Sequence, residues 1–257
     1  MRLSNRYRLL VRAGTAVVAV VAAKLAMHAL GWETLSLNPL FSGIVAANVF
    51  LMGFLLNGVL SDFKESERLP GELAAGLENL AQDVRGIGLA RADADVRPCL
   101  GALAALAADV RGWFHKQVRS RALTERLDAL TPEFAKLEQW TQATLVSRLK
   151  QEQGALRRLL TRAHTIRETS FIASGYLLAD LVTVLLCVGL VLVRIEPFHE
   201  SLFFVTVIAY FMIYLLMLIR DLDNPFGYYD GASGEDVSLK PLEDAIERLH
   251  RLAAEGR

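Results

Sequence analysis

The sequence predicts an all-α integral membrane protein with four transmembrane helices and a cytoplasmic helical insert between the second and the third. Of its 257 residues, 53% are hydrophobic, a composition that an unusually apolar soluble domain would also have. The apolar residues, however, gather in four nearly uncharged windows, and each is close to the ~20 residues that a membrane-spanning helix needs. These windows are residues 13–32, 39–60, 171–193 and 201–219.

The order of the windows divides the chain into four segments. We expect the N-terminus and the first two transmembrane helices in residues 1–60, the cytoplasmic helical region in 61–170, the last two transmembrane helices in 171–220, and a cytoplasmic loop and helix in 221–257. Four arginines precede the first window, whereas the 32–38 connection has neither Lys nor Arg. Because basic residues are enriched on the cytoplasmic side of transmembrane helices, both termini are expected in the cytoplasm.

The second window is the centre of the prediction. Pro39 suits the first turn of a helix and Pro70 cannot continue one, so we expect a helix of about 31 residues and about 46 Å that crosses the membrane and projects into water. Six of its residues follow a spacing of 4, 3, 4, 3 and 4, which places them on one narrow face of the helix. They are Gly43, Ala47, Phe50, Phe54, Asn57 and Ser61.

This face has two interpretations. If several copies of the helix surround an axis, the face lines a pore with an aromatic constriction. If the helix packs against neighbouring helices, the same small residues form an ordinary packing surface, and the pattern considered alone is more typical of packing.

Two charged side chains lie inside apolar windows. Lys24 lies about 20 Å beyond the point where the first helix enters the membrane, and Asp180 lies about ten residues into the third helix. A charge at such a depth needs a partner or must reach the interface. We therefore expect either a Lys24–Asp180 ion pair or two separate groups, one snorkelling and one facing the pore.

The polar region is helical in its pattern. Apolar residues recur at three and four spacing over 71–91 and 99–120, with a break from Asp93 to Pro98. Thr131 and Pro132 suit the cap and the first turn of a helix that opens near Glu133 and runs toward the third window. A final amphipathic helix is expected over 241–254.

The sequence argues against several other functions. Its five histidines are scattered without metal-ligand spacing, and Gly86-Ile87-Gly88 lacks the third glycine of a nucleotide-binding fingerprint. We therefore expect no enzyme, no metal and no cofactor. The formal net charge is zero and no basic patch is present, so nucleic acid is not an expected partner.

Three features together resemble the bestrophins, and more closely the short bacterial bestrophin-like membrane proteins. The first is the order of two spanning helices, a helical insert, two more spanning helices and a tail. The second is the long second helix with aromatic residues one turn apart. The third is a tetrapeptide directly after the fourth spanning helix, which is expected over 201–219. That tetrapeptide is Asn224, Pro225, Phe226 and Gly227. The resemblance implies a homopentameric ion channel of a bacterial inner membrane, with its own copies, the lipid bilayer and small inorganic ions as partners.

The resemblance also implies roles for single residues. Phe50 and Phe54 match the apolar neck of the family, and Asn57 lies on its cytoplasmic side. The pore-lining set is then Ala47, Phe50, Phe54, Asn57 and Ser61. The acidic run that follows the tetrapeptide in calcium-regulated members is diluted over 228–236, so no calcium ligands are assigned. At the cytoplasmic mouth, Lys64 and Arg68 oppose Glu65 and Glu67, which favours neither anions nor cations.

The alternative is a non-conducting, membrane-anchored helical scaffold or sensor whose cytoplasmic region binds a partner. In such a protein, removing the rings of Phe50 and Phe54 would change assembly but no ion flux.

Overall fold

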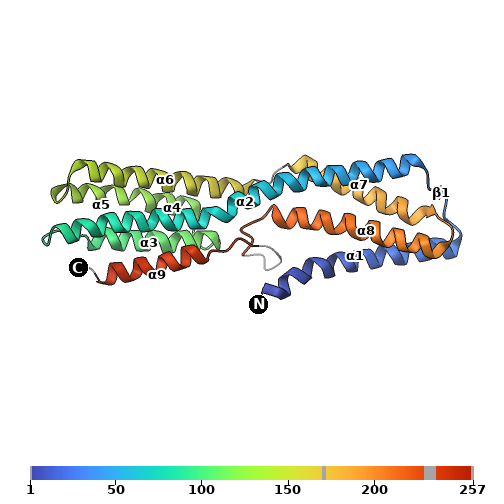
Figure 1. Ribbon diagram of the computed structural model, residues 1–257, viewed down its shortest axis with the longest axis horizontal. Coiled ribbons are helices and arrows are strands. Elements are labelled where there is room, and N and C mark those ends of the chain that lie inside the picture. Colours follow the sequence, from blue (N-terminus) through green and yellow to red (C-terminus); the bar gives the residue numbers. More distant parts are fainter. Residues whose placement is uncertain (1, 170–171, 229–235, 256–257) are drawn as a thin grey trace. The chain divides into compact units, whose positions relative to one another are not determined.

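The computed structural model describes residues 2–169, 172–228 and 236–255, and these are helical almost throughout (Figure 1). The two strands, β1 and β2, have two residues each and pair in parallel, Leu35 with Val193 and Ser36 with Arg194. The elements are α1 (Arg2–Leu30), β1 (Leu35–Ser36), α2 (Pro39–Ala90), α3 (Arg97–Phe114), α4 (Ser120–Asp128), α5 (Leu130–Lys136), η1 (Leu137–Gln139), α6 (Ala143–Glu168), α7 (Ala173–Leu192), β2 (Val193–Arg194), α8 (Phe198–Leu222) and α9 (Lys240–Glu255).

Four helical segments of the described chain are long and apolar enough to cross a membrane, and they contain α1, α2, α7 and α8. Each overlaps one of the four apolar windows. The predicted all-α membrane protein with four transmembrane helices is therefore confirmed. The cytoplasmic position of the insert stays a prediction.

The chain forms two compact units. The first unit holds α1, the part of α2 up to Phe63, α7 and α8. Its core is an apolar cluster in which one face of α2 meets α7 and α8. The buried members of that cluster are Met52, Leu55, Val59, Ala179, Leu186, Leu190, Val205, Ala209, Met212, Ile219 and Leu222.

The second unit holds the part of α2 from Lys64 onward, α3 to α6, and α9. Helix α9 lies against α3, and α4 and α5 lie against α6 (Figure 1). The core of this unit contains the large side chains Trp113, Phe114 and Phe134, each at most 1% exposed. The amphipathic helix predicted over 241–254 is α9, and the residues of its apolar side are buried.

Helix α2 corrects the predicted helix end. It runs for 52 residues with Pro70 in its interior, a length of about 78 Å, so the expected stop at Pro70 is wrong. A proline inside a helix costs about 3 kcal/mol because one backbone hydrogen bond is lost. Leu69 and Leu73 on either side are buried, and each such burial contributes about 1.5–3 kcal/mol. Packing therefore outweighs the local break.

Two further helices end earlier than predicted. The helix expected over 99–120 ends at Phe114, and Lys116 takes a positive φ of 57° before α4 begins at Ser120. The helix expected from Glu133 onward is divided into α5, η1 and α6, with extended backbone at Gln142. Apolar residues are buried on both sides of each break, so the helical spacing continues across it and conceals it in the sequence.

Candidate functional site

The predicted stripe of α2 lies outside the packed core of its unit. All six of its residues are exposed in the single chain, and the rings of Phe50 and Phe54 are 79% and 57% exposed. The opposite face of the same helix carries Met52, Leu55 and Val59, which are buried in the bundle core. Packing within the chain therefore does not explain the stripe, which is available to another copy of α2, to lipid or to water.

The polar end of the stripe distinguishes among these surroundings. Asn57 and Ser61 are exposed, and Asn57 falls inside the apolar window of residues 39–60. A carboxamide that faces hydrocarbon loses its hydrogen bonds to water, which costs free energy. A surface that meets lipid alone therefore does not suit the polar end of the stripe, where Asn57 and Ser61 are exposed.

Asn48 fixes the rotation of α2 and was not singled out in the sequence. Its side chain is 2% exposed, and its Nδ2 donates to Thr183 Oγ1 of α7 at 3.3 Å and to Met212 Sδ of α8 at 3.6 Å. Hydrogen bonds inside an apolar bundle favour one orientation of a helix. The orientation they hold leaves Phe50, two residues further on, exposed. An asparagine in the middle of an apolar run is the sequence signal for such a buried polar contact.

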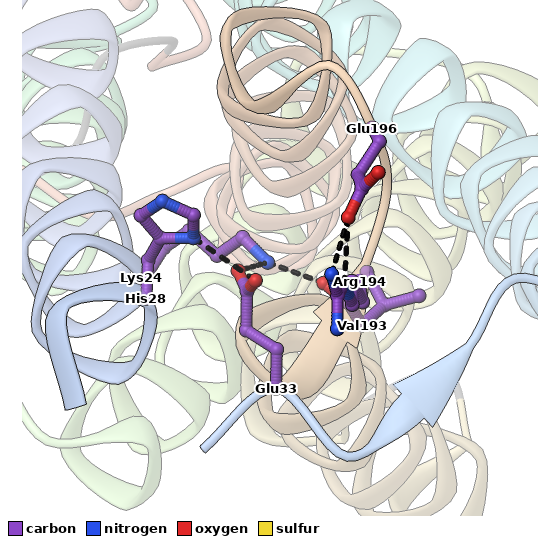
Figure 2. Close-up of polar contacts among 6 residues, drawn as sticks. All are labelled: Lys24, His28, Glu33, Val193, Arg194 and Glu196. Atoms are coloured by element: carbon purple, nitrogen blue, oxygen red, sulfur yellow. Dashed lines mark hydrogen bonds and ion pairs between the residues drawn. The ribbon is translucent and has the colours of Figure 1, made fainter. Parts of the chain in front are cut away.

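Lys24 is completely buried, and its ammonium is satisfied at one end of the bundle (Figure 2). Its Nζ lies 2.6 Å from Oε1 of Glu33, in the connection that follows α1, and donates to the carbonyl oxygen of Val193 in β2. His28 places its Nδ1 3.0 Å from Oε2 of the same carboxylate, and its ring stacks on Phe198 with centroids 3.7 Å apart.

The expected Lys24–Asp180 pair is therefore wrong, and so is snorkelling of Lys24. Because β1 follows α1, β2 follows α7 and the two strands pair, the ends of these helices lie together. Lys24 lies six residues, or about 9 Å, before the end of α1, whereas Asp180 lies twelve residues, or about 18 Å, before the end of α7. This difference in depth separates the two charges. Asp180 instead pairs with Arg220 of α8.

Burial and charge act in opposite directions on Glu33, which lies outside the spanning helices. Its burial raises the pKa, while the hydrogen bonds and charges of Lys24 and His28 lower it, and the net effect is a pKa below the ordinary 4.5. The carboxylate is therefore charged at neutral pH, as a buried ammonium requires.

The tetrapeptide of residues 224–227, which follows α8, is part of a packed turn. Helix α8 ends at Leu222, and Pro225, Phe226 and Gly227 are buried. The ring of Phe226 lies 4.9 Å from that of Phe114 in α3. Tyr228 follows and donates its hydroxyl hydrogen to the carbonyl oxygen of Val237, and burial raises the pKa of this phenol. The tetrapeptide thus anchors the segment in the second unit.

The rest of the acidic stretch, residues 229–235, lies outside the described residues. Among the described residues, no group of three His, Cys, Asp or Glu side chains is arranged to hold a metal ion.

The charges near the end of the stripe are not equivalent. Glu65 accepts hydrogen bonds from Nε and Nη2 of Arg162 at 2.7 and 2.5 Å, and this arginine is the main cause of the lowered pKa of Glu65. Lys64, Glu67 and Arg68 are exposed. The carboxylate of Glu65 is thus paired within the chain, whereas Glu67 is exposed together with the two cations.

Comparison with known proteins identifies the fold. No protein-family model and no curated protein matches the sequence. A crystal structure of a bacterial bestrophin homologue from Klebsiella pneumoniae with a single substitution matches with a TM-score of 0.82 at 17% identity, covering 96% of this chain and 98% of the other. Another structure of a Klebsiella pneumoniae bestrophin homologue gives 0.73 at 18% identity over the same shares.

A third structure, described as a membrane protein with a substitution, gives a TM-score of 0.72 at 20% identity and covers 99% of this chain and 98% of its own. These likenesses extend over nearly the full length of this chain and of each compared chain. The chain is therefore a multi-pass membrane protein with the fold of the bacterial bestrophin homologues.

Proposed function

We propose that copies of this chain assemble around an axis and form an ion channel whose pore is lined by α2. The single observation that carries this proposal is the exposure of the whole stripe from Gly43 to Ser61 on a helix whose opposite face is buried. The pore-lining residues are Ala47, Phe50, Phe54, Asn57 and Ser61.

The aromatic pair supplies the neck. An ion that leaves water among benzyl rings finds nothing that replaces its hydration shell, so an apolar constriction holds a pore closed by dewetting. Asn57 and Ser61 then offer polar groups to the ion on the cytoplasmic side of the neck. Small inorganic ions are the permeant species, and no chemical step by the protein is needed for their passage.

The assembly and its place in the cell rest on further arguments. The fold likeness to bestrophin homologues supports a homopentamer, and the arginines before the first spanning helix support cytoplasmic termini. Under this proposal the second unit is the cytoplasmic helical region and the membrane is a bacterial inner membrane. Lys64 and Arg68 then stand near the cytoplasmic mouth of the pore.

One observation favours a second function, a scaffold that binds a partner. The second unit has a groove of about 580 Å³ between α2 and α9, lined by Glu67, Ala74, Glu78, Lys240, Asp244 and Arg248 among others. The groove carries both signs of charge, as a protein-binding surface often does. A scaffold of this kind conducts no ions.

Ion flux and assembly mass test the proposal together. The purified protein is reconstituted into liposomes that hold potassium chloride, and potassium and chloride release are each followed with an ion-selective electrode. We expect release above that of empty liposomes, and a native mass in detergent that corresponds to several copies. Release equal to that of empty liposomes, from the natural protein and from variants without the rings alike, would contradict the channel and favour the scaffold.

A further inference from the structure

We propose that Lys24 is a positioning residue of the pore. Its ion pair with Glu33, which we call the latch, holds the end of α2 that begins at Pro39 and faces the outer solution. Acidification of the outer solution opens the latch. The inference rests on the proposed channel function and deepens it, because it names a group that controls the pore-lining helix without touching the ion path.

The latch joins three segments through one ammonium. Lys24 comes from α1, Glu33 from the connection that follows it, and the Val193 carbonyl oxygen from β2, directly after α7 (Figure 2). Figure 2 shows the ammonium between the carboxylate and this carbonyl. Because Val193 also pairs with Leu35 in the β1–β2 ladder, the same contact supports the strand that leads into α2. A buried ammonium with a single carboxylate partner depends on that partner.

The connection transmits this contact to the pore-lining helix over a short distance. Glu33 precedes Asn38 by five residues, and Oδ1 of Asn38 accepts a hydrogen bond from the amide of Phe41 at 2.9 Å, which caps α2. Phe41 in turn packs closely on Gly189 of α7, where a Cβ would lie 2.7 Å from the ring. The start of α2 is thus seated on α7 next to the latch.

The charged and titratable groups around the latch have different exposures. Glu33 retains 9% of its side-chain exposure, whereas His28 retains 46% and is open to water. On the facing segment, Arg194 and Glu196 form their own ion pair and are 66% and 71% exposed. Glu33 supplies the carboxylate of the latch, so neutralisation of Glu33 removes the ion pair with Lys24.

The direction of the pH effect follows from Glu33. Its pKa in the folded protein lies below 4.5, so the latch contributes its full stabilisation above that value. The contribution is lost as the pH falls through the lower, folded-state pKa. Below it, Lys24 is left as a buried cation without a counterion, and the connection and the first turns of α2 are expected to loosen.

Three variants test the latch in planar bilayers with potassium chloride on both sides. E33Q removes the carboxylate charge and keeps the shape, and K24M/E33Q removes both charges so that no buried ion is left. E196Q is the matched control, because it breaks the neighbouring exposed ion pair. We expect E33Q at neutral pH to conduct about tenfold more than the natural protein, which corresponds to about 1.4 kcal/mol, because a loosened α2 weakens the dewetted neck.

We further expect the natural protein to reach the conductance of E33Q, reversibly, when the outer solution is acidified below the lowered pKa of Glu33. The double variant is expected to conduct as the natural protein does at neutral pH and to lose the acid response, and E196Q is expected to behave as the natural protein throughout. An E33Q conductance equal to that of the natural protein at neutral pH, or an acid response retained in K24M/E33Q, would overturn the latch.

Hydrogen–deuterium exchange separates this inference from the channel itself. Amides of residues 34–42 are expected to exchange faster in E33Q than in the natural protein at the same neutral pH, and to be unchanged in E196Q. If exchange is faster in E33Q but neither the natural protein nor any variant conducts ions, the latch is retained and the channel is contradicted. Conductance with identical exchange in E33Q and the natural protein would retain the channel and remove the latch.

Discussion

Replacing Phe50 and Phe54 together by alanine is expected to raise the ion conductance of the reconstituted protein by more than about tenfold, the increase that each ~1.4 kcal/mol removed from a barrier produces. The two rings lie one turn apart on the exposed face of α2 and are the only aromatic side chains of the six-residue stripe. Alanine widens the constriction and lets water enter, so the barrier from dehydration falls.

The matched control for the neck is Phe203→Ala. Phe203 lies on α8 and is 62% exposed, so the substitution removes the same ring from another exposed position of the same unit. Under the account proposed here Phe203 faces lipid and its loss leaves conductance unchanged. An equal rise in both variants, or none in the double alanine variant, would show that ions do not pass the α2 rings.

Phe226→Ala is expected to cost about 3–5 kcal/mol in stability, the range for a fully buried phenylalanine. The ring is 0% exposed and contacts Phe114, itself fully buried. Its loss leaves a cavity beside Phe114, in the turn that follows α8, and the large rings around it have little freedom to collapse. The second unit is therefore expected to unfold at a clearly lower temperature.

Thermal unfolding of the purified protein in detergent, followed by far-ultraviolet circular dichroism, measures this effect. Leu89→Ala is the control, since Leu89 belongs to the same unit and is 69% exposed. Its midpoint is expected to stay close to that of the natural protein, because exposed substitutions change stability by about 0.5 kcal/mol or less. Equal midpoints for both variants would mean that the packing of Phe226 contributes no stability.

The features that the sequence predicts correctly are local. A spanning helix is a long apolar run, so the four windows identify α1, α2, α7 and α8 without knowledge of their neighbours. The spacing of the α2 stripe is equally local, and it separates the exposed face with Phe50 and Phe54 from the buried face with Met52 and Leu55. Together with the order of the windows and the tetrapeptide at 224–227, these local features lead to the bestrophin-like fold.

The features that the sequence alone does not reveal depend on tertiary contacts. Glu33 looks like an ordinary acidic residue of a polar connection, and only the pairing of β1 with β2 brings it to Lys24. The sequence does not reveal the partner of Asp180, because the depths of two side chains in two different helices can be compared only when the positions of the helix ends are known. Pro70 is a strong local break that buried neighbours override, and its effect is therefore decided by packing.

The central claim, that ions pass along the stripe of α2, is tested most directly by modifying a cysteine placed at Asn57. Cys187→Ala removes one native thiol, and Cys99 is buried with its pKa raised by burial to about 12, so it stays unreactive. In the neck-alanine background a charged methanethiosulfonate reagent, added from water, is expected to modify Asn57→Cys and to block the flux. Full modification, verified by mass, with an unchanged flux would contradict the claim.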